Sequence, residues 1–552
     1  GIVSKNFEVK LDDFLSAHKD IRISRTSFFL SAFTFLLCKY NATKSIISNM
    51  VHNGRSDDVK NTYGMFIKTM PFVFAYENDK SIIDKLVDDT SLIKELRNKN
   101  QVSFTDLAEK YGIKNDINFA YQDTVTNFGL MKDQGLLTER IYDKNHIEES
   151  KIVFEILKND NNNYNVHLLY RSDYYSKEIM DSFVSAYIKV ANEFLTKKSF
   201  GEIEITNDDE IKKLDGFFGP ELKYDENDTI VSLINKSIKN YKNNLAVVAK
   251  NKQLTYDELR IESNKYSNFL IESGVKRGEV VAILIDRDEM TAVLPFASLK
   301  VGATYMPIDP AYPDDRVNFM LKDSGSVVLF TLKKYKSKIS SEYTGSIVCI
   351  DDDNYKNKFN NDRDVDVKVD ANDRFIILYT SGTTGTPKGV ELLHKNIVAT
   401  VTYMNNMRRT KEKFYGNVRV AAYASFGFDA NMYDMYPPLT SGGTLFIIPD
   451  EIRLDLYAIR EFYNKNKITH GFMTTQVARQ FIELEGLDTL IEFGTGGEKL
   501  ASVKPPKFKF LNLYGPTECT IFSTSFDVEK VMKDIPIGHA TDNNHLYIID
   551  EL

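Results

Sequence analysis

The second half of the chain carries short apolar runs of strand length that alternate with stretches of helical periodicity. From Thr229 onward these runs occupy 245–249, 280–285, 327–331, 375–378, 418–422, 445–448 and 508–513. Such alternation is typical of βα units and predicts largely parallel sheets covered by helices. Because ligands of such sheets bind beyond the carboxyl ends of the strands, the turns after these runs are where functional residues are expected.

The first 200 residues have a different pattern, in which helices and strands mix without regular alternation. Helical spacing predicts a helix over 26–40, capped by Thr26 or Ser27, and strands are predicted over 45–50 and 164–170. A second helix is predicted over 176–195, with these residues on one apolar face: Ile179, Phe183, Tyr187, Ala191 and Phe194.

The stretch between the two patterns is polar and contains the breakers Gly216, Gly219 and Pro220. We therefore expect a first domain over 1–200, a linker over 201–228 and a second domain over 229–552. A chain of 552 residues with 42% apolar residues is long enough for two such cores.

Charge and cysteine content exclude several classes of protein. The net charge is −8 and no sustained Lys/Arg block occurs, so a nucleic-acid partner is not expected. The longest apolar run, 28–38, is half the length of a membrane span and indicates a core helix. Three widely spaced cysteines without a CxxC pair argue for a reducing, cytoplasmic location and against structural zinc.

The segment 379–389, YTSGTTGTPKG, follows the strand predicted over 375–378 and has the composition of a phosphate-binding loop. Its glycines let backbone amides approach anionic oxygens, its hydroxyls add donors, and Lys388 supplies positive charge. It is not a Walker loop, because Pro387 and Gly389 stand where that motif has Gly and Ser/Thr. Taken alone, a Gly/Thr-rich string of this kind is also compatible with a polar turn.

The full string resembles the signature of the adenylate-forming, or AMP-binding, superfamily. Five further stretches occur in that family's order: LTYDEL (254–259), LKVGATYMPID (299–309), FD (428–429), GGE (496–498) and NLYGPTE (512–518). More narrowly, the set is similar to the adenylation domain of a nonribosomal peptide synthetase. The resemblance implies an α/β fold, namely the large amino-terminal core of the adenylate-forming (acyl-CoA synthetase-like) fold.

The resemblance also implies ATP and Mg²⁺ as ligands. Local chemistry agrees for Glu518, since a carboxylate beside a phosphate loop is repelled unless a cation lies between them, although an acid at a helix start is an alternative. Catalytic roles are implied for Thr517, which contacts the α-phosphate, for Glu518 as the metal ligand, and for Lys388 in the phosphate loop. Nucleotide-binding roles are implied for Thr380, Ser381, Gly382, Thr383, Thr384, Gly385, Gly497, Glu498, Asn512 and Tyr514, the last packing on adenine.

Asp429 is the residue expected to select an amino acid over other carboxylic acids, because a buried carboxylate needs a cationic partner such as a substrate ammonium. The alternative is a carboxylate that caps a helix starting near Ala430. By resemblance the substrate pocket is lined by Asp429, Ala430, Tyr433, Phe472, Gly494, Gly496, Leu513, Ile521 and Phe522. Apart from Asp429 this lining is uncharged, which favours an apolar and most simply an aliphatic side chain.

Residues 1–200 resemble the carboxyl-terminal lobe of a peptide-synthetase condensation domain, of chloramphenicol-acetyltransferase-like fold. The matching strings are ISNMVHNGR (47–55), YGMFIKTMP (63–71), QVSFTDL (101–107) and NFAYQD (118–123), with Lys68 where the family usually has Asn. The family's HHxxxDG motif does not occur, and His52 and His167 are interpreted as ordinary strand or loop histidines. The resemblance implies a partial condensation lobe, and a chain that stops before the small mobile adenylation subdomain and the carrier.

These observations predict part of a peptide synthetase module that activates an apolar amino acid as aminoacyl-AMP. The expected partners are the amino acid, ATP and carrier domains bearing phosphopantetheine, which is not attached to this chain. Two alternatives stay open. One is a stand-alone acyl- or aryl-CoA ligase of the same fold; the other is a non-catalytic segment that binds nucleotide or docks modules.

Overall fold

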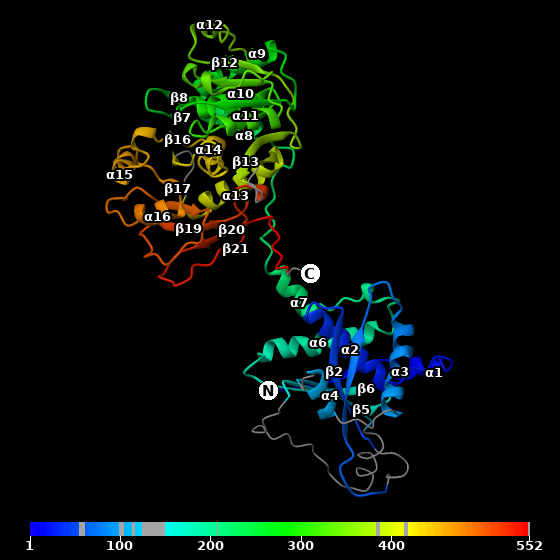
Figure 1. Cartoon of the computed structure of the whole chain (residues 1–552). Coiled ribbons are helices and arrows are strands. Elements are labelled where there is room, and N and C mark those ends of the chain that lie inside the picture. The colour runs from blue at the N-terminus through cyan, green and yellow to red at the C-terminus, as the bar shows by residue number, and fades with distance from the viewer. Residues whose placement is uncertain are drawn as a thin grey trace. The chain divides into compact units, whose positions relative to one another are not determined.

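The structure is a computed structural model that describes residues 1–54, 61–98, 104–112, 116–123, 150–206, 208–381, 387–412 and 418–549. The chain divides into two compact units (Figure 1). Unit 1 comprises Gly1–Asp215 with Ile548–Leu552, and unit 2 comprises Gly216–Tyr547. The division falls inside the polar stretch 201–228, which also holds helix α7 (Asp208–Asp215).

Unit 1 is built on a mixed sheet. In the described part of the chain its strand order is β1-β6-β5-β4-β2-β3, with parallel pairing of β2 to β4 and of β4 to β5 and antiparallel pairing elsewhere. The strands are β1 (Ile2–Glu8), β2 (Ser45–His52), β3 (Lys68–Ala75), β4 (Ile117–Asp123), β5 (Ile152–Asp160) and β6 (Asn163–Tyr170). His52 and His167 therefore lie in strands β2 and β6, as interpreted from the sequence.

Helices α2 (Arg25–Tyr40) and α6 (Lys177–Glu193) pack on each other and on this sheet (Figure 1). The predicted cap of α2 is wrong by two to three residues, because Ser24 is the N-cap and its hydroxyl accepts the Ser27 amide. In α6, Ile179 is 51% exposed, so the buried face begins further along the helix, at Met180 and Phe183. In the described part of unit 1 the chain also forms α1 (Leu11–Ala17), α3 (Ile82–Asn98), α4 (Phe104–Tyr111) and the 3₁₀ turn η3 (Phe200–Glu202), besides α7.

The first sheet of unit 2 has the order β12-β11-β9-β10-β13-β14 among the described residues. All of its pairs are parallel except β13 with β14. The strands are β9 (Val280–Leu284), β10 (Thr304–Pro307), β11 (Val328–Thr331), β12 (Ser346–Cys349), β13 (Arg374–Ser381) and β14 (Pro387–Leu393). The last two form a hairpin around the phosphate-loop string.

The second sheet of unit 2 has the order β21-β20-β19-β18-β17-β15-β16-β7-β8 in the described ranges, and its central strands are parallel. The strands are β7 (Leu245–Val248), β8 (Gln253–Thr255), β15 (Arg419–Ala422), β16 (Thr444–Ile447), β17 (His470–Thr474), β18 (Glu492–Gly496), β19 (Lys509–Tyr514), β20 (Thr524–Asp527) and β21 (His539–Ala540). All seven apolar runs predicted as strands are confirmed as β7, β9, β11, β13, β15, β16 and β19.

Helices pack against these sheets and connect their parallel strands. They are α8 (Ile230–Tyr241), α9 (Tyr256–Glu272), α10 (Met290–Lys300), α11 (Asp314–Asp323), α12 (Asp353–Lys356), α13 (His394–Glu412), α14 (Ala430–Ser441), α15 (Leu456–Lys465) and α16 (Thr475–Phe481), with 3₁₀ turns η4 (Lys333–Lys338), η5 (Asp450–Ile452) and η6 (Thr517–Cys519). No helix within the described ranges is both long enough and apolar enough to cross a membrane.

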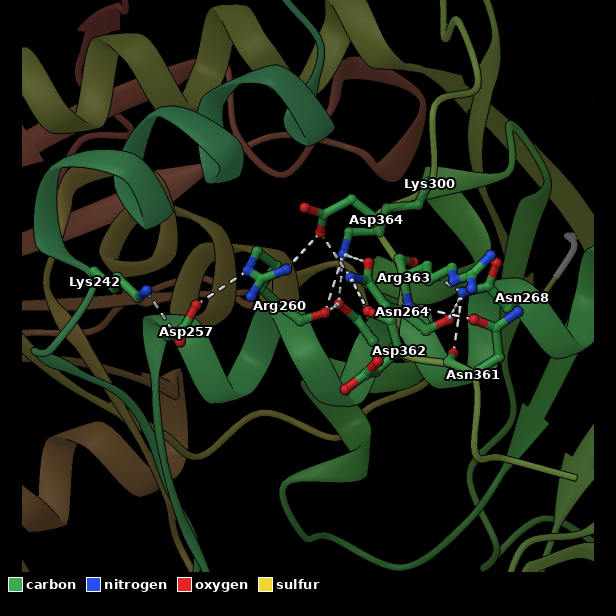
Figure 2. A network of polar contacts seen from close by, with 11 residues as sticks. Lys242, Asp257, Arg260, Asn264, Asn268, Lys300, Asn361, Asp362, Arg363 and Asp364 are labelled. Atoms are coloured by element: carbon green, nitrogen blue, oxygen red, sulfur yellow. Dashed lines mark hydrogen bonds and ion pairs between the residues drawn. The ribbon is translucent and has the colours of Figure 1, made fainter. Parts of the chain in front are cut away.

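A polar network fixes the segment 361–364 to helix α9 (Figure 2). Asn268 donates to the carbonyls of Asn361 and Arg363, and Asn264 donates to the Asp362 carbonyl. From α10, the buried Lys300 ammonium donates to Asn264 Oδ1 over 2.7 Å. The network holds a long irregular connection against the core without a sheet ladder.

Candidate active site

The phosphate-loop string lies in the β13–β14 hairpin. The register pairs Thr380 with Lys388 and Ser381 with Pro387, so the two ends of the string are neighbours. The predicted phosphate-binding residues Gly382, Thr383, Thr384 and Gly385 lie outside the described residues. The hairpin differs from a strand–loop–helix turn, because the chain returns antiparallel through β14 before α13 begins.

The turn that follows β19 carries Thr517 and Glu518 in η6. Its path requires glycine at Gly515, where a Cβ would lie 2.4 Å from the Phe522 Cα. Thr520 and Ile521 adopt left-handed backbone angles, with φ of 63° and 74°. This tight return places η6 in contact with β14, and so brings the predicted metal ligand Glu518 beside the strand that carries Lys388.

A cavity of about 650 Å³ opens beside this turn. It is lined by eleven residues predicted from the sequence: Asp429, Ala430, Phe472, Gly496, Gly497, Glu498, Asn512, Leu513, Tyr514, Ile521 and Phe522. Residues that sequence reasoning missed include Tyr423, Ala424 and Arg453. The first two follow β15, so the rule that sites lie beyond strand carboxyl ends was the signal for them.

Asp429 occupies the N-cap position of α14, but its side chain does not cap the helix. Instead its Oδ2 accepts a hydrogen bond from the Thr517 hydroxyl over 2.7 Å. Burial raises the pKa of Asp429, and the negative charge of Glu518 raises it further, against the opposing hydrogen bonds of Thr517 and the Ala430 amide. The helix-cap alternative is therefore wrong, and the carboxylate faces the cavity with a need for positive charge.

The mouth and walls of the cavity suit a nucleoside. Phe428 and Tyr514 are more than half exposed there, so each offers an aromatic ring to a planar base. At Gly497 the backbone has φ of 99°, and no atom lies within 4 Å of the position a Cβ would take. The Thr475 hydroxyl donates to the carbonyls of Gly496 and Glu498, which fixes this glycine segment over the cavity.

The inner wall of the cavity, which we define as Phe472, Leu513 and Phe522, is apolar. Two predicted pocket residues, Tyr433 and Gly494, do not line the cavity and lie behind this wall instead. The Tyr433 ring lies 5.4 Å from that of Phe472 and 6.0 Å from that of Phe522. Gly494 is required because a Cβ there would lie 2.9 Å from the Tyr433 hydroxyl.

Two buried charges that the sequence did not single out hold the segment after β15. Asp434 of α14 accepts the amides of Tyr423 and Ala424 over 3.0 and 3.2 Å. Arg287 donates to the carbonyl of Ala424 over 2.6 Å. Burial raises the pKa of Asp434 to about 7 and lowers that of Arg287 to about 10. Asp434 stands among mostly apolar residues in NMYDMYPP, and this was the sequence signal for a buried carboxylate that holds a neighbouring segment.

The fold and the site together define an adenylate-forming enzyme domain, and the comparisons agree. The family model "AMP-binding enzyme" matches residues 234–552, more than half of the chain, and the model "Condensation domain" matches 3–214. The chain belongs to the AMP-binding enzyme family, with a condensation domain preceding the AMP-binding region.

Curated relatives are peptide synthetases of bacilli. The chain is 28% identical to surfactin synthase subunit 2 of Bacillus subtilis (strain 168) over 538 residues, covering 94% of this chain and 15% of that protein. It is 31% identical to gramicidin S synthase 1 of Brevibacillus brevis over 338 residues, covering 60% of this chain and 30% of that protein. The chain thus spans under a third of either relative's length.

Solved structures share the fold over the whole chain. The nonribosomal peptide synthetase FmoA3 matches with a TM-score of 0.80 and 17% identity, covering 100% of this chain and 63% of that one. A four-domain nonribosomal peptide synthetase bound to AMP and glycine matches with a TM-score of 0.72 and 19% identity, covering 100% and 43%. The predicted fold, a condensation lobe followed by an adenylate-forming core, is confirmed.

Proposed function

We propose that unit 2 activates an apolar amino acid with ATP, forming aminoacyl-AMP and pyrophosphate. The observation that carries the proposal is the hydrogen bond between Asp429 and Thr517 at the cavity. In this reaction Asp429 binds the α-ammonium group of the substrate, and the single hydroxyl proton of Thr517 turns from Asp429 to the α-phosphate of ATP. The residues that bind the amino acid and the α-phosphate are therefore neighbours, which would bring the substrate carboxylate next to the α-phosphorus.

The reaction joins a carboxylate oxygen of the amino acid to the α-phosphorus of ATP and breaks the bond to the oxygen that bridges the α- and β-phosphates. The electron pair of that bond leaves with pyrophosphate. No proton transfer is needed, so the protein acts by positioning and by offering donors to the phosphate oxygens. Lys388, which is exposed on β14, would approach the departing β- and γ-phosphates.

The donor set around η6 fits a magnesium ion. Mg²⁺ prefers oxygen ligands, keeps several waters, and binds through one or two carboxylates together with substrate phosphates. Glu518 supplies such a carboxylate, and its charge already acts on Asp429 nearby. When bound, the ion would neutralise the charge that develops on the phosphate oxygens.

The inner wall supports an apolar substrate side chain. Phe472, Leu513 and Phe522 present no hydrogen-bonding group to the cavity, and a charged or amide side chain placed against them would be buried without a partner. We expect valine, leucine or isoleucine to fit best. The aminoacyl group would then pass to the phosphopantetheine thiol of a carrier domain, and unit 1 would belong to the region that forms the peptide bond.

The experiment is amino-acid-dependent exchange of radiolabelled pyrophosphate into ATP, run with the purified chain and all twenty amino acids. Exchange with aliphatic amino acids is the expected result. A preference for a charged amino acid would overturn the specificity. Product formation with coenzyme A and a fatty or aryl acid would point to a CoA ligase. Failure to bind ATP·Mg²⁺ in isothermal titration would indicate a non-catalytic segment.

A further inference from the structure

Behind the inner wall lies a buried cation that the proposed chemistry does not use. Arg408 of α13 is 2% exposed, and its guanidinium stands over the Tyr433 ring at 5.7 Å from the centroid. No hydrogen bond of good geometry reaches its three guanidinium nitrogens among the described residues, but the guanidinium lies close enough to the Tyr433 hydroxyl to oppose the rise in the pKa of Tyr433 that burial causes. The carboxylate of Glu492 approaches Arg408 Nε only to 3.8 Å, and its other oxygen accepts from Lys509 over 3.0 Å.

In this buried position the Arg408 guanidinium contributes little to the stability of the fold. Removing a guanidinium from water is expensive, and a buried ion pair of imperfect geometry seldom repays that cost. An apolar side chain of similar length would be cheaper at this position. The Glu492 carboxylate would still be paired with Lys509 if Arg408 were replaced.

The contact that Arg408 does make leads to the substrate pocket. Tyr433 is fully buried, with Arg408 over its ring and with Phe472 and Phe522 beside it. Its hydroxyl occupies the space that Gly494 leaves open. A cation over an aromatic ring in a dry site is attracted to it, so the guanidinium restrains the tilt and position of the ring.

We propose that Arg408 is a positioning residue that presses Tyr433 against the inner wall and thereby sets the length of side chain the amino-acid pocket accepts. This inference rests on the proposed function of the same cavity. The guanidinium does not touch the substrate. It acts through Tyr433 on Phe472 and Phe522, which do.

The test uses equilibrium binding of two non-hydrolysable aminoacyl-adenylate analogues, valyl and phenylalanyl adenosine sulfamate, to the full chain. The readout is the ratio of their dissociation constants, with AMP binding measured beside it. We expect Arg408→Met to shift the ratio about threefold or more toward the longer side chain, within the range that such pockets discriminate. AMP affinity should not change, and the melting temperature should hold or rise.

Two further variants separate positioning from general loosening. Tyr433→Ala should shift the ratio in the same direction and further, and adding Arg408→Met to it should produce no additional shift, since the residue through which Arg408 acts is gone. The matched control is Arg460→Met, because Arg460 stands over the exposed Tyr457 ring at 5.6 Å, away from the cavity. It should leave the ratio unchanged. Arg408→Lys keeps a cation and should give an intermediate ratio of dissociation constants. This variant replaces Arg408→Met in the test if the Met variant does not fold.

The possible outcomes distinguish failure of the proposed role of Arg408 from failure of the proposed function. Additive effects of Arg408→Met and Tyr433→Ala, or an unchanged ratio in every foldable Arg408 variant, would overturn the positioning role while wild-type binding of the analogues still supports activation of amino acids. Wild-type protein that binds AMP but neither analogue would instead defeat the proposed function itself.

Discussion

The Thr517 hydroxyl donates to Oδ2 of Asp429 over 2.7 Å, and so joins the turn after β19 to the first residue before α14. In the proposed reaction these side chains serve different substrates, one the α-ammonium group and the other the α-phosphate. The carboxylate that attacks the phosphorus is bonded to the same carbon as the ammonium group. Because the two binding residues are already neighbours in the ligand-free chain, the substrate carboxylate would be held next to the phosphorus that it attacks.

Asp429→Ala should lower amino-acid-dependent pyrophosphate exchange by about 30-fold or more, because loss of one partner of a buried charge pair costs about 2–5 kcal/mol. The matched control is Asp455→Ala. Asp455 does cap its helix, accepting the amides of Tyr457 and Ala458, so its loss should cost about 1 kcal/mol of unfolding free energy and leave exchange unaffected. Exchange at the wild-type rate in Asp429→Ala would remove that residue from substrate binding.

Glu518→Gln should raise the Mg²⁺ concentration needed for half-maximal exchange by about tenfold or more, since the amide keeps the size of the side chain and loses the charge that binds the ion. Chelation of Mg²⁺ should abolish exchange in both proteins. Cys519→Ser, in the same exposed turn, is the control and should keep the wild-type Mg²⁺ dependence. An identical Mg²⁺ titration for Glu518→Gln would mean that the metal is held elsewhere.

Local patterns in the sequence were sufficient for seven strands of unit 2, and the family resemblance supplied the predicted residues of the cavity lining. A buried parallel strand must be an apolar run, and the turn after it must carry the ligand-binding groups, so 418–422 and 508–513 could be predicted with their sites. Strand β14 could not be predicted, because its sequence PKGVELL has neither an apolar run nor a sustained alternation of apolar and polar residues. Its position in the sheet is set by pairing with β13.

The parts of the site that escaped prediction depend on contacts between distant segments. Nothing in the neighbourhood of Arg408 or Arg287 in the sequence shows that either is buried. Tyr433 was assigned to the pocket, but it lies one layer behind because Gly494 admits its hydroxyl. Burial of a charge and the depth of a side chain are properties of the packed core, not of spacing along the chain.

The buried Lys300 should contribute more to the stability of the folded protein as the pH rises above 7. Burial lowers the pKa of Lys300 to about 7, while the unfolded chain holds the same proton to pH 10 or above. Between these values the unfolded state binds more protons, so raising the pH favours the folded state, by up to about 1.4 kcal/mol per pH unit for one group. The unfolding free energy of wild type minus that of Lys300→Met should therefore grow from pH 7 to pH 10.

Hydrogen exchange of peptides from α9 and α10 measures this difference in unit 2 alone. The control is Lys242→Met, whose exposed ammonium pairs with Asp257 at 3.5 Å at the edge of the same network (Figure 2). Its difference from wild type should be small and flat over the same pH range. A flat difference for Lys300→Met as well would show that Lys300 keeps its proton when buried.

In unit 1, the stability that Asp12 contributes should be lost as the pH falls. Burial opposes its charge, but hydrogen bonds from the Asn162 amide, Arg25 and Tyr164 outweigh burial and lower the pKa to about 2. A carboxyl whose pKa is depressed on folding stabilises the protein above its unfolded pKa, near 4, and loses that effect as the pH falls toward 2. Asp12→Asn should therefore cost about 2 kcal/mol or more at pH 7, measured by hydrogen exchange of peptides from α1 and β6, and almost nothing at pH 2. Asp13→Asn, the exposed neighbour, should be neutral at both, and a cost for Asp12→Asn that persists at pH 2 would assign the loss to packing and not to charge.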